Sequence, residues 1–100
     1  MAKRIANVIV DSPIREPLDY LVPADIEIQV GQRCLVPLGT RKVVGIVVGF
    51  SEESRFSKLR EVISRVDDIA PLSFGWLALT SFAARYYQSG WGQVAIPALP

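Results

Sequence analysis

The segment RCLVPLGTRKVVGIVVGF, residues 33–50, decides the fold class because it joins two apolar runs through a short polar turn. Residues 33–38 and 42–50 are rich in β-branched and other apolar side chains, a composition that favours strands. Gly39 lies in the connection between them, so we expect a β-hairpin. Gly45 interrupts the second run and indicates a bulge or a bend where a small sheet curls.

Shorter segments surround this hairpin. IANVIV, residues 5–10, predicts a strand, whereas EPLDYLVP, residues 16–23, carries a proline at each end and predicts a loop or a very short edge strand. ADIEIQVGQ, residues 24–32, alternates in hydropathy but is expected to be a partly packed loop. The β-branched content of residues 59–68 favours a strand over a helix. Pro37 has no backbone N–H, so we expect it at a sheet edge or a bulge.

A helical period replaces this pattern near residue 72. Between Pro71 and Gly90, which are start and stop signals, apolar side chains recur at Leu72, Trp76, Leu79, Ala83 and Tyr86 or Tyr87. We expect one helix, with Trp76 and Tyr86 in the core rather than in a base-stacking platform. The sequence therefore predicts a mainly β, α+β domain: a small curled antiparallel sheet or partial barrel with one C-terminal helix.

The C-terminal third is poor in charge. From residue 72 to residue 100 the only charged side chain is Arg85. Such a segment usually packs against another part of the protein. Two packing partners stay open: the core of this domain and a further domain.

Charge and length limit the kind of DNA contact that is possible. The chain has 100 residues, which suits one domain, and 11 Lys and Arg stand against 10 Asp and Glu. A domain that coats a long stretch of duplex DNA is strongly basic, so any nucleic-acid contact here must be local.

The residue types exclude most catalytic chemistry. Without histidine and with a single cysteine, Cys34, the chain has no Cys/His zinc site, no internal disulfide and no His-assisted nucleophile. No phosphate-binding GxxxxGK[ST] run is present, and the acidic pair Asp67 and Asp68 is expected only to favour a helix start. We predict no catalytic residue, no metal ligand and no cofactor in this domain.

The cellular location of the protein is inferred from weaker signals in the sequence. Cys34 is expected to be a buried small hydrophobe, and an unpaired cysteine suits a reducing cytoplasm. No apolar run approaches the roughly 20 residues that span a bilayer, and the apolar run near the N-terminus is too short for a signal peptide. We therefore expect a cytoplasmic protein without membrane contact.

A family resemblance is carried by five segments in order: PLDYLVP, VGQRCLVPLG, VVGIVVGF, KLREVISRVDDIAPL and AARYYQSGWGQVAIPALP. Together they resemble the N-terminal domain of the PriA family of primosomal replication-restart helicases (primosomal protein N-prime). The resemblance covers nearly the whole chain, and its specificity lies in the order and spacing of the segments. The family usually has an aromatic residue before its Asp-Tyr pair, where this chain has Leu18. The glycine of the family's VPxG matches Gly39, and a basic position, usually lysine, matches Arg60.

This resemblance implies a domain that holds the free 3′-hydroxyl end of a nascent DNA strand at an arrested replication fork. It implies DNA contacts by Leu18, Asp19, Gly39 and Arg60, with Tyr20 as a supporting residue. Family members continue with a winged helix, two ATP-dependent 3′–5′ helicase lobes and a zinc region. Residues 1–100 would then be a single, non-enzymatic domain of a larger helicase. Its partners would be forked or single-stranded DNA with a free 3′ end, the remaining helicase domains and other primosome proteins.

The chemistry of Asp19 agrees with such a role. A carboxylate only accepts hydrogen bonds, and a strand's 3′ end offers donors in its hydroxyl and in the N–H groups of any of the four bases. Leu18 would give the terminal base a weaker surface than an aromatic ring, and Arg60 would balance a phosphate.

Other interpretations of these residues stay open. Asp19 alone would be a turn-forming or helix-capping acid, Gly39 a hairpin glycine and Arg60 a solvated charge. The competing function is a protein–protein docking module without direct DNA contact.

Overall fold

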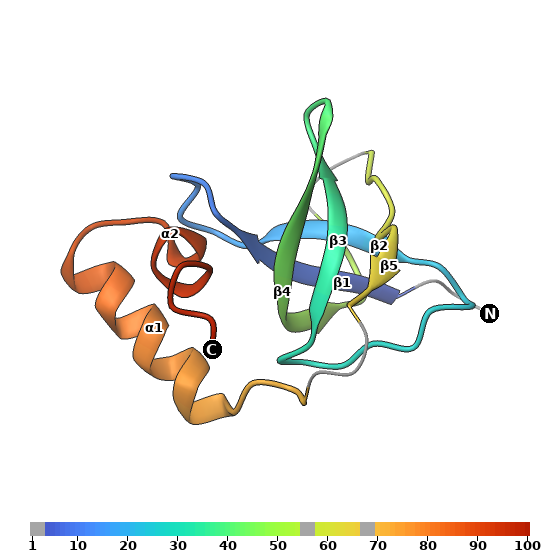
Figure 1. Cartoon of the computed structure of the whole chain (residues 1–100). Coiled ribbons are helices and arrows are strands. Elements are labelled where there is room, and N and C mark those ends of the chain that lie inside the picture. The colour runs from blue at the N-terminus through green and yellow to red at the C-terminus, as the bar shows by residue number, and fades with distance from the viewer. Residues whose placement is uncertain (1–3, 55–57, 67–69) are drawn as a thin grey trace.

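The computed structural model describes residues 4–54, 58–66 and 70–100. Within these ranges, five antiparallel strands form one sheet in the order β2-β1-β4-β3-β5, and two helices follow it (Figure 1). The strands are β1 (Arg4–Val10), β2 (Leu18–Val22), β3 (Arg33–Leu38), β4 (Arg41–Ser51) and β5 (Ser64–Arg65). The prediction of a mainly β, α+β fold is confirmed.

The expected hairpin is formed by β3 and β4, which pair from Arg33–Ile46 to Leu38–Arg41. The bulge lies elsewhere than Gly45. The register between β1 and β4 shifts after Asn7, so that Val48 of β4 has no partner. Gly45 instead marks a close approach, because a Cβ there would collide with the side chain of Val8.

Pro37 lies on the open side of β3, as expected of a proline. The carbonyl of Leu35 accepts from the backbone N–H of Ile63, so the backbone groups of Leu35 face away from β4. Pro37, two residues on, has the same orientation. The short β5 pairs only with Cys34 and Leu35, so the missing N–H of Pro37 faces no strand.

The segment after β4 closes the sheet. Leu21 of β2 donates to the carbonyl of Arg60 at 2.9 Å, and Val62 donates back to Leu21 at 2.9 Å. Ile63 reaches β3 through its bond to Leu35. Residues 60–65 thus join the two edges of the sheet into a partial barrel. The strand expected over 59–68 is formed only at β5, and Asp67 and Asp68 lie outside the described residues.

The barrel interior is one of two apolar clusters. It holds the buried residues Ala6, Val8, Val10, Tyr20, Val22, Ile28, Cys34, Val36, Val47 and Val62. Cys34 is completely buried, as predicted, and desolvation raises the pKa of its thiol to about 12. It acts as a small hydrophobe with an unreactive thiol.

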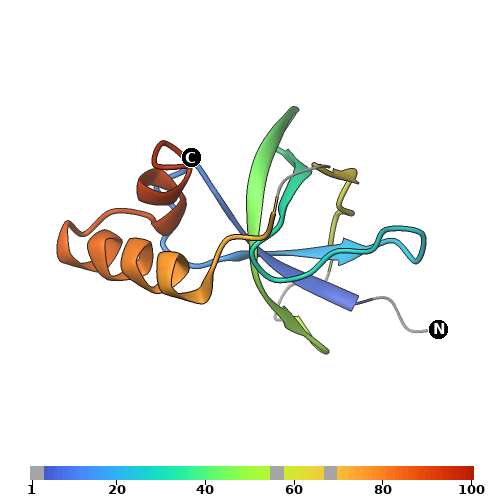
Figure 2. The ribbon, with the colours of Figure 1, turned by 60° about the horizontal axis from the view of Figure 1, so that its bottom comes forward.

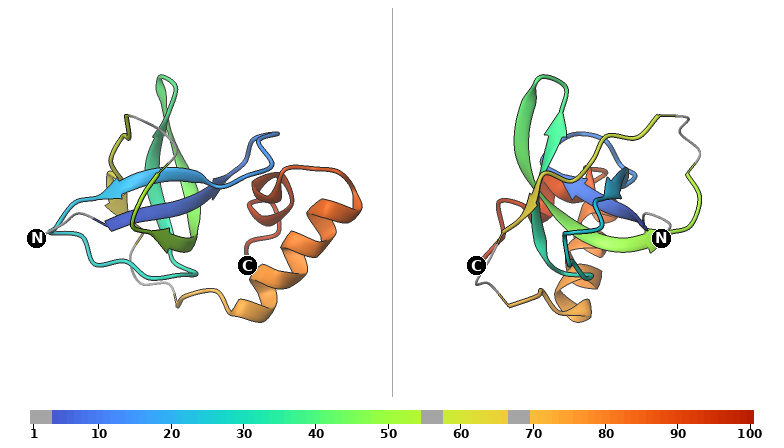
Figure 3. Two further views of the ribbon diagram at one scale, coloured as in Figure 1. Left: turned by 180° about the vertical axis from the view of Figure 1, so that it is seen from behind. Right: turned by 90° about the vertical axis from the view of Figure 1, so that its right-hand side faces the viewer.

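The helices α1 (Phe74–Tyr86) and α2 (Trp91–Ala95) lie beside the barrel rather than at its mouth, as Figures 2 and 3 show from other sides. Ser73 caps α1 by accepting from the backbone N–H of Trp76 at 3.1 Å. The second apolar cluster joins the helices to the outer face of the sheet. Its buried members are Ile9, Ile46, Leu77 and Ala95.

The prediction of which side of α1 packs against the core is partly wrong. Trp76 and Leu72 pack against the second cluster, but Leu79 is 66% exposed and Tyr86 is 72% exposed. The buried residues of α1 are Leu77, Thr80 and Ala84. The helix is apolar on both sides, so helical spacing alone does not identify the face that packs.

The second helix was not predicted, because five residues between a glycine and a proline give no helical period. Gly92 lies so close to β1 that a Cβ would overlap the backbone of Val10. In the described part of the chain, no helix combines the length and the hydropathy that crossing a bilayer requires.

Candidate nucleic-acid interface

Strand β2 forms inside the segment EPLDYLVP, and its alternation divides the predicted site residues between two sides. Tyr20 points into the barrel and is 4% exposed, and its hydroxyl donates to the carbonyl of Pro37 at 2.7 Å. Burial raises the pKa of Tyr20, an effect that the charge of Arg60 opposes in part. The neutral hydroxyl therefore ties β2 to β3 close to the hairpin turn.

Asp19 faces the other way and is held by two side chains. Its Oδ1 accepts from Asn7 Nδ2 at 2.9 Å, and its Oδ2 accepts from Ser54 Oγ at 2.6 Å. Asn7 is its cross-strand partner in the register of β1 and β2, and the same amide contacts Ser51 Oγ at 3.1 Å. Because Asp19 lies inside a strand, it neither forms a turn nor caps a helix.

The held carboxylate keeps spare acceptor capacity. An ionised carboxylate has about four lone-pair positions, and the two bonds described use one on each oxygen. Asn7 and Ser54 therefore orient Asp19 without saturating it. Sequence reasoning missed both, since they are neutral and lie 12 and 35 residues away.

Arg60 and Gly39 are in direct contact. The guanidinium Nη1 of Arg60 donates to the Gly39 carbonyl at 2.6 Å. Gly39 has φ +61°, which favours glycine, and a Cβ there would meet nothing within 4 Å. Its hairpin role is thus evident, and its outer surface is open to an approaching molecule.

A small hollow brings the predicted residues together. It has a volume of about 170 Å³ and is lined by Leu18, Asp19, Tyr20, Lys58, Leu59 and Arg60. Gly39 is outside this lining and joins it through Arg60. Leu18 is half-buried and also packs against the barrel interior, so only part of its side chain is available to the hollow.

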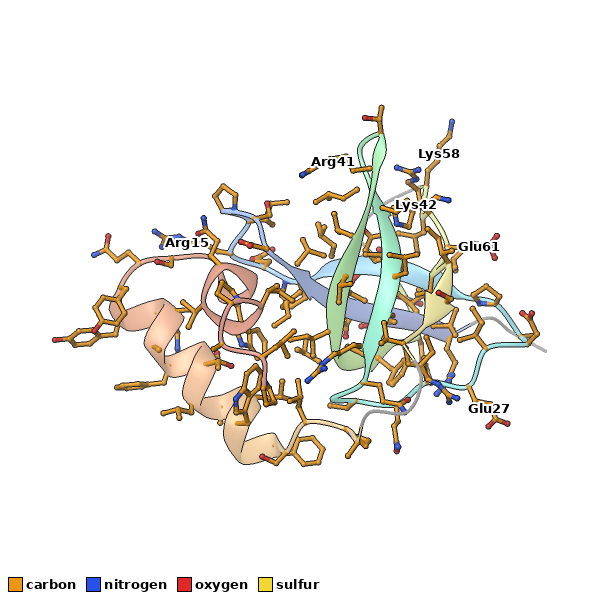
Figure 4. The ribbon with its side chains drawn as sticks, in the orientation of Figure 1. Arg15, Glu27, Arg41, Lys42, Lys58 and Glu61 are labelled. Carbon is orange, nitrogen blue, oxygen red and sulfur yellow. The ribbon has the colours of Figure 1, made fainter. Side chains whose placement is uncertain are left out.

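Cations gather around this end of the barrel. Lys58, in the hollow, was missed by sequence reasoning, although it stands only two positions before Arg60. Arg41 and Lys42 are exposed at the start of β4, on the hairpin whose Gly39 carbonyl accepts from Arg60, and Figure 4 labels both along that hairpin. Positive charge is thus present on the hairpin, at Arg41 and Lys42, and on the segment that Arg60 joins to it, although the chain has almost no net charge.

Two further hollows fit a DNA end less well. One of about 570 Å³ also touches Asp19 but is lined by a second acid, Glu16, with Asn7, Pro17, Val48 and Trp91 and no cation. The other, of about 510 Å³, lies at the far end of β2 and contains none of the predicted site residues. Its arginines, Arg4 and Arg65, already donate to the carbonyls of Ile28 and Glu27.

Comparison with known proteins decides the family. Residues 7–100 match the family model of the PriA 3′DNA-binding domain (3′BD). The chain belongs to the PriA family. It is 38% identical over 102 residues to the replication restart protein PriA of Haemophilus influenzae, an alignment that covers 97% of this chain and 14% of that protein.

More distant PriA proteins match the same region. The PriA of Rickettsia felis is 31% identical over 97% of this chain and 15% of its own length. The PriA of Buchnera aphidicola is 29% identical over 96% of this chain and 14% of its own length. This chain thus spans about one seventh of the length of these PriA proteins.

Proposed function

We propose that this PriA-type domain binds the free 3′-hydroxyl end of a DNA strand, without base preference, in the hollow between β2 and residues 58–60. The observation that carries the proposal is that Asp19, held by Asn7 and Ser54, lines one hollow together with Lys58 and Arg60. The family's description as a 3′DNA-binding domain supports it.

Asp19 would select an end. Its spare lone pairs accept from the terminal hydroxyl or from a base N–H, and every base has such a donor. A carboxylate repels phosphate, so an internal stretch of backbone is a poor ligand for the same position. Selection for an end and indifference to the base thus follow from one functional group.

The surrounding side chains would position the end. Lys58 and Arg60 provide the positive charge that the nearest phosphate needs. Leu18 and Leu59 give the last base an apolar surface. The open side of Gly39 lets backbone or sugar approach the hairpin.

The larger role is proposed from the relatives. The matching proteins are named replication restart proteins and are about seven times as long as this chain. We propose that the domain places an ATP-dependent, zinc-containing helicase on an arrested fork in the cytoplasm. Its partners would then include the remaining helicase domains and other primosome proteins. The domain itself would hydrolyse nothing and would need no cofactor.

The alternative, a docking module without DNA contact, is favoured by one observation: the outer side of α1 carries large exposed apolar residues. This surface is separate from the hollow, so docking on it would not block DNA binding in the hollow.

The test compares three versions of one oligonucleotide, labelled internally, by fluorescence anisotropy. One ends in a 3′-hydroxyl, one carries a 3′-phosphate, and the control carries the same phosphate at its 5′ end. Like charges about 4 Å apart repel by about 1 kcal/mol even at the dielectric of water, so the 3′-phosphate should weaken binding at least about fivefold. The 5′-phosphate should leave affinity unchanged. Equal affinity for all three would refute 3′-end binding.

A further inference from the structure

Helix α1 is apolar on two opposite sides. One side is buried at Leu77, Thr80 and Ala84. Leu77 joins the second apolar cluster with Ile9 and Ile46 of the sheet. Thr80 Oγ1 accepts from Trp91 Nε1 of α2 at 3.0 Å. The other side and the helix ends expose five large side chains, which we call the aromatic face: Phe74 (77% exposed), Leu79 (66%), Phe82 (60%), Tyr86 (72%) and Tyr87 (72%). A helix that is hydrophobic all round is normally buried in the complete protein.

The aromatic face is already ordered by contacts within itself. Phe82 and Tyr86 stack with ring centroids 6.5 Å apart, and Tyr87 meets Tyr86 edge-on at 5.0 Å. Rings that are fixed in this way lose little conformational freedom when they are covered.

Its composition favours a protein partner over DNA. Interface cores are rich in aromatic residues and poor in charge, and Arg85 is the one charged residue after position 71. Single-stranded DNA needs a cationic groove alongside stacking rings. The nearby Arg15 donates its Nη2 to the carbonyl of Gln88 at 3.1 Å, at the end of the helix rather than along the face.

Area favours a partner within the same polypeptide. A helix of 13 residues is about 20 Å long and about 10 Å wide. One side of it offers much less than the roughly 800 Å² per partner that a stable complex between separate molecules buries. A contact within one chain needs less area, because the effective concentration of the linked partner is high.

The available chain length fits such a partner. The PriA proteins that match this chain are about seven times as long, so most of such a protein lies outside these residues. The helices and the candidate DNA hollow lie in different parts of the molecule, with α1 on the left of Figure 1 and the β3–β4 hairpin at the top. A body packed on α1 would leave the hollow free.

We propose that the aromatic face of α1 is the surface on which this domain packs against the rest of its own, longer PriA polypeptide. This proposal shares one assumption with the proposed function, namely that the domain is part of a longer PriA polypeptide. It does not require 3′-end binding.

The test measures the reactivity of introduced thiols toward a maleimide. Leu79→Cys places a thiol on the aromatic face, and Ala24→Cys places the control on the exposed turn after β2. The native Cys34 is buried with a raised pKa and should react slowly. Each variant is prepared in the 100-residue chain and in the longer natural protein, and peptides are quantified by mass spectrometry.

We expect both positions to react at similar rates in the 100-residue chain. In the longer protein, position 79 should react at least about tenfold more slowly than position 24. This ratio corresponds to a free energy of about 1.4 kcal/mol for covering the thiol. Phe82→Cys provides an independent position if Leu79→Cys fails to fold, with the same expectation.

Equal rates at the two positions in the longer protein would overturn the proposal. So would protection of position 79 in the 100-residue chain that grows with protein concentration, since a second copy would then be the partner. Protection that appears only on adding a single-stranded oligonucleotide would assign the face to nucleic acid. Anisotropy titrations on the same samples report 3′-end binding separately, so the two proposals can fail independently.

Discussion

Replacing Tyr20 by Phe tests whether the hollow is built as described. The change removes only the hydroxyl that donates to the Pro37 carbonyl at 2.7 Å. Both residues are buried, and the carbonyl faces the side of β3 where β5 has ended. The variant therefore leaves a buried acceptor without this donor.

The expected loss can be worked from this geometry. An unsatisfied buried acceptor costs about 1–3 kcal/mol, and we expect a loss of about 1–2 kcal/mol because Arg60, which lines the same hollow as Tyr20, is exposed to solvent. For a domain of this size each kcal/mol lowers Tm by about 4–8 °C. Tyr20→Phe should therefore melt roughly 5–15 °C below the parent, and its affinity for a 3′-ended oligonucleotide should fall because β2 is less firmly tied to the hairpin.

The assay is thermal unfolding followed by circular dichroism, with Tyr86→Phe as the matched control. The control makes the same chemical change on a side chain that is 72% exposed, where we expect a change within about 0.5 kcal/mol. If Tyr20→Phe melted like Tyr86→Phe, the bond to Pro37 would not hold the hollow together, and the reasoning would be refuted.

Three other predictions follow from the same structure. Salt should weaken oligonucleotide binding only gently, with a slope of log K against log salt shallower than about −2, because one or two phosphates contribute about −0.7 each; a steeper slope in anisotropy titrations would indicate a long electrostatic track. Leu18→Phe should strengthen binding of a 3′-ended oligonucleotide by up to about 1 kcal/mol through stacking, and unchanged affinity in a folded variant would show that residue 18 does not meet the base. Folding raises the pKa of Cys34 from 9.0 to about 12, so above pH 9 the thiol ionises in the unfolded chain but not in the folded one. The contribution of Cys34 to the free energy of unfolding is therefore fully present below pH 9 and should fall by about 1.4 kcal/mol per pH unit between pH 9 and 12. Urea titrations should show a clearly shallower fall for Cys34→Ala, with the raised pKa of Tyr20 leaving some loss above pH 10.

The hairpin was predictable because local composition determines it. Residues 33–50 contain two β-branched runs and a glycine that takes φ +61°, so propensity and turn geometry agree. Strand β2 was harder, because its five residues lie after a proline and before another, and its pairing partner β1 is supplied only by the fold. The packing side of α1 was not predictable from spacing, because Leu79 and Tyr86 repeat as regularly as Leu77 and Ala84.

The candidate site was predictable only in part, and through the family resemblance. Composition alone gave no reason to single out Asp19 or Arg60. The structure adds Asn7 and Ser54, which hold Asp19, and Lys58, which borders the hollow. These partners depend on the register of β1 with β2 and on the path of the chain after β4, neither of which a single sequence specifies.

The most direct test of 3′-end capture is the ratio of affinities for a 3′-hydroxyl and a 3′-phosphate oligonucleotide, measured for the parent, for Asp19→Ala and for the exposed control Glu27→Ala. Thermal melts of all three proteins verify that each is folded. Asp19→Ala should lose about 1.5–3 kcal/mol for the 3′-hydroxyl end, similarly for A, C, G and T. It should also discriminate much less against the 3′-phosphate, because the repelling carboxylate is gone. Glu27→Ala should keep both the affinity and the ratio of the parent. A folded Asp19→Ala protein with the parent's ratio, whether its affinities fall equally or stay the same, would contradict the assignment of Asp19 to the DNA end.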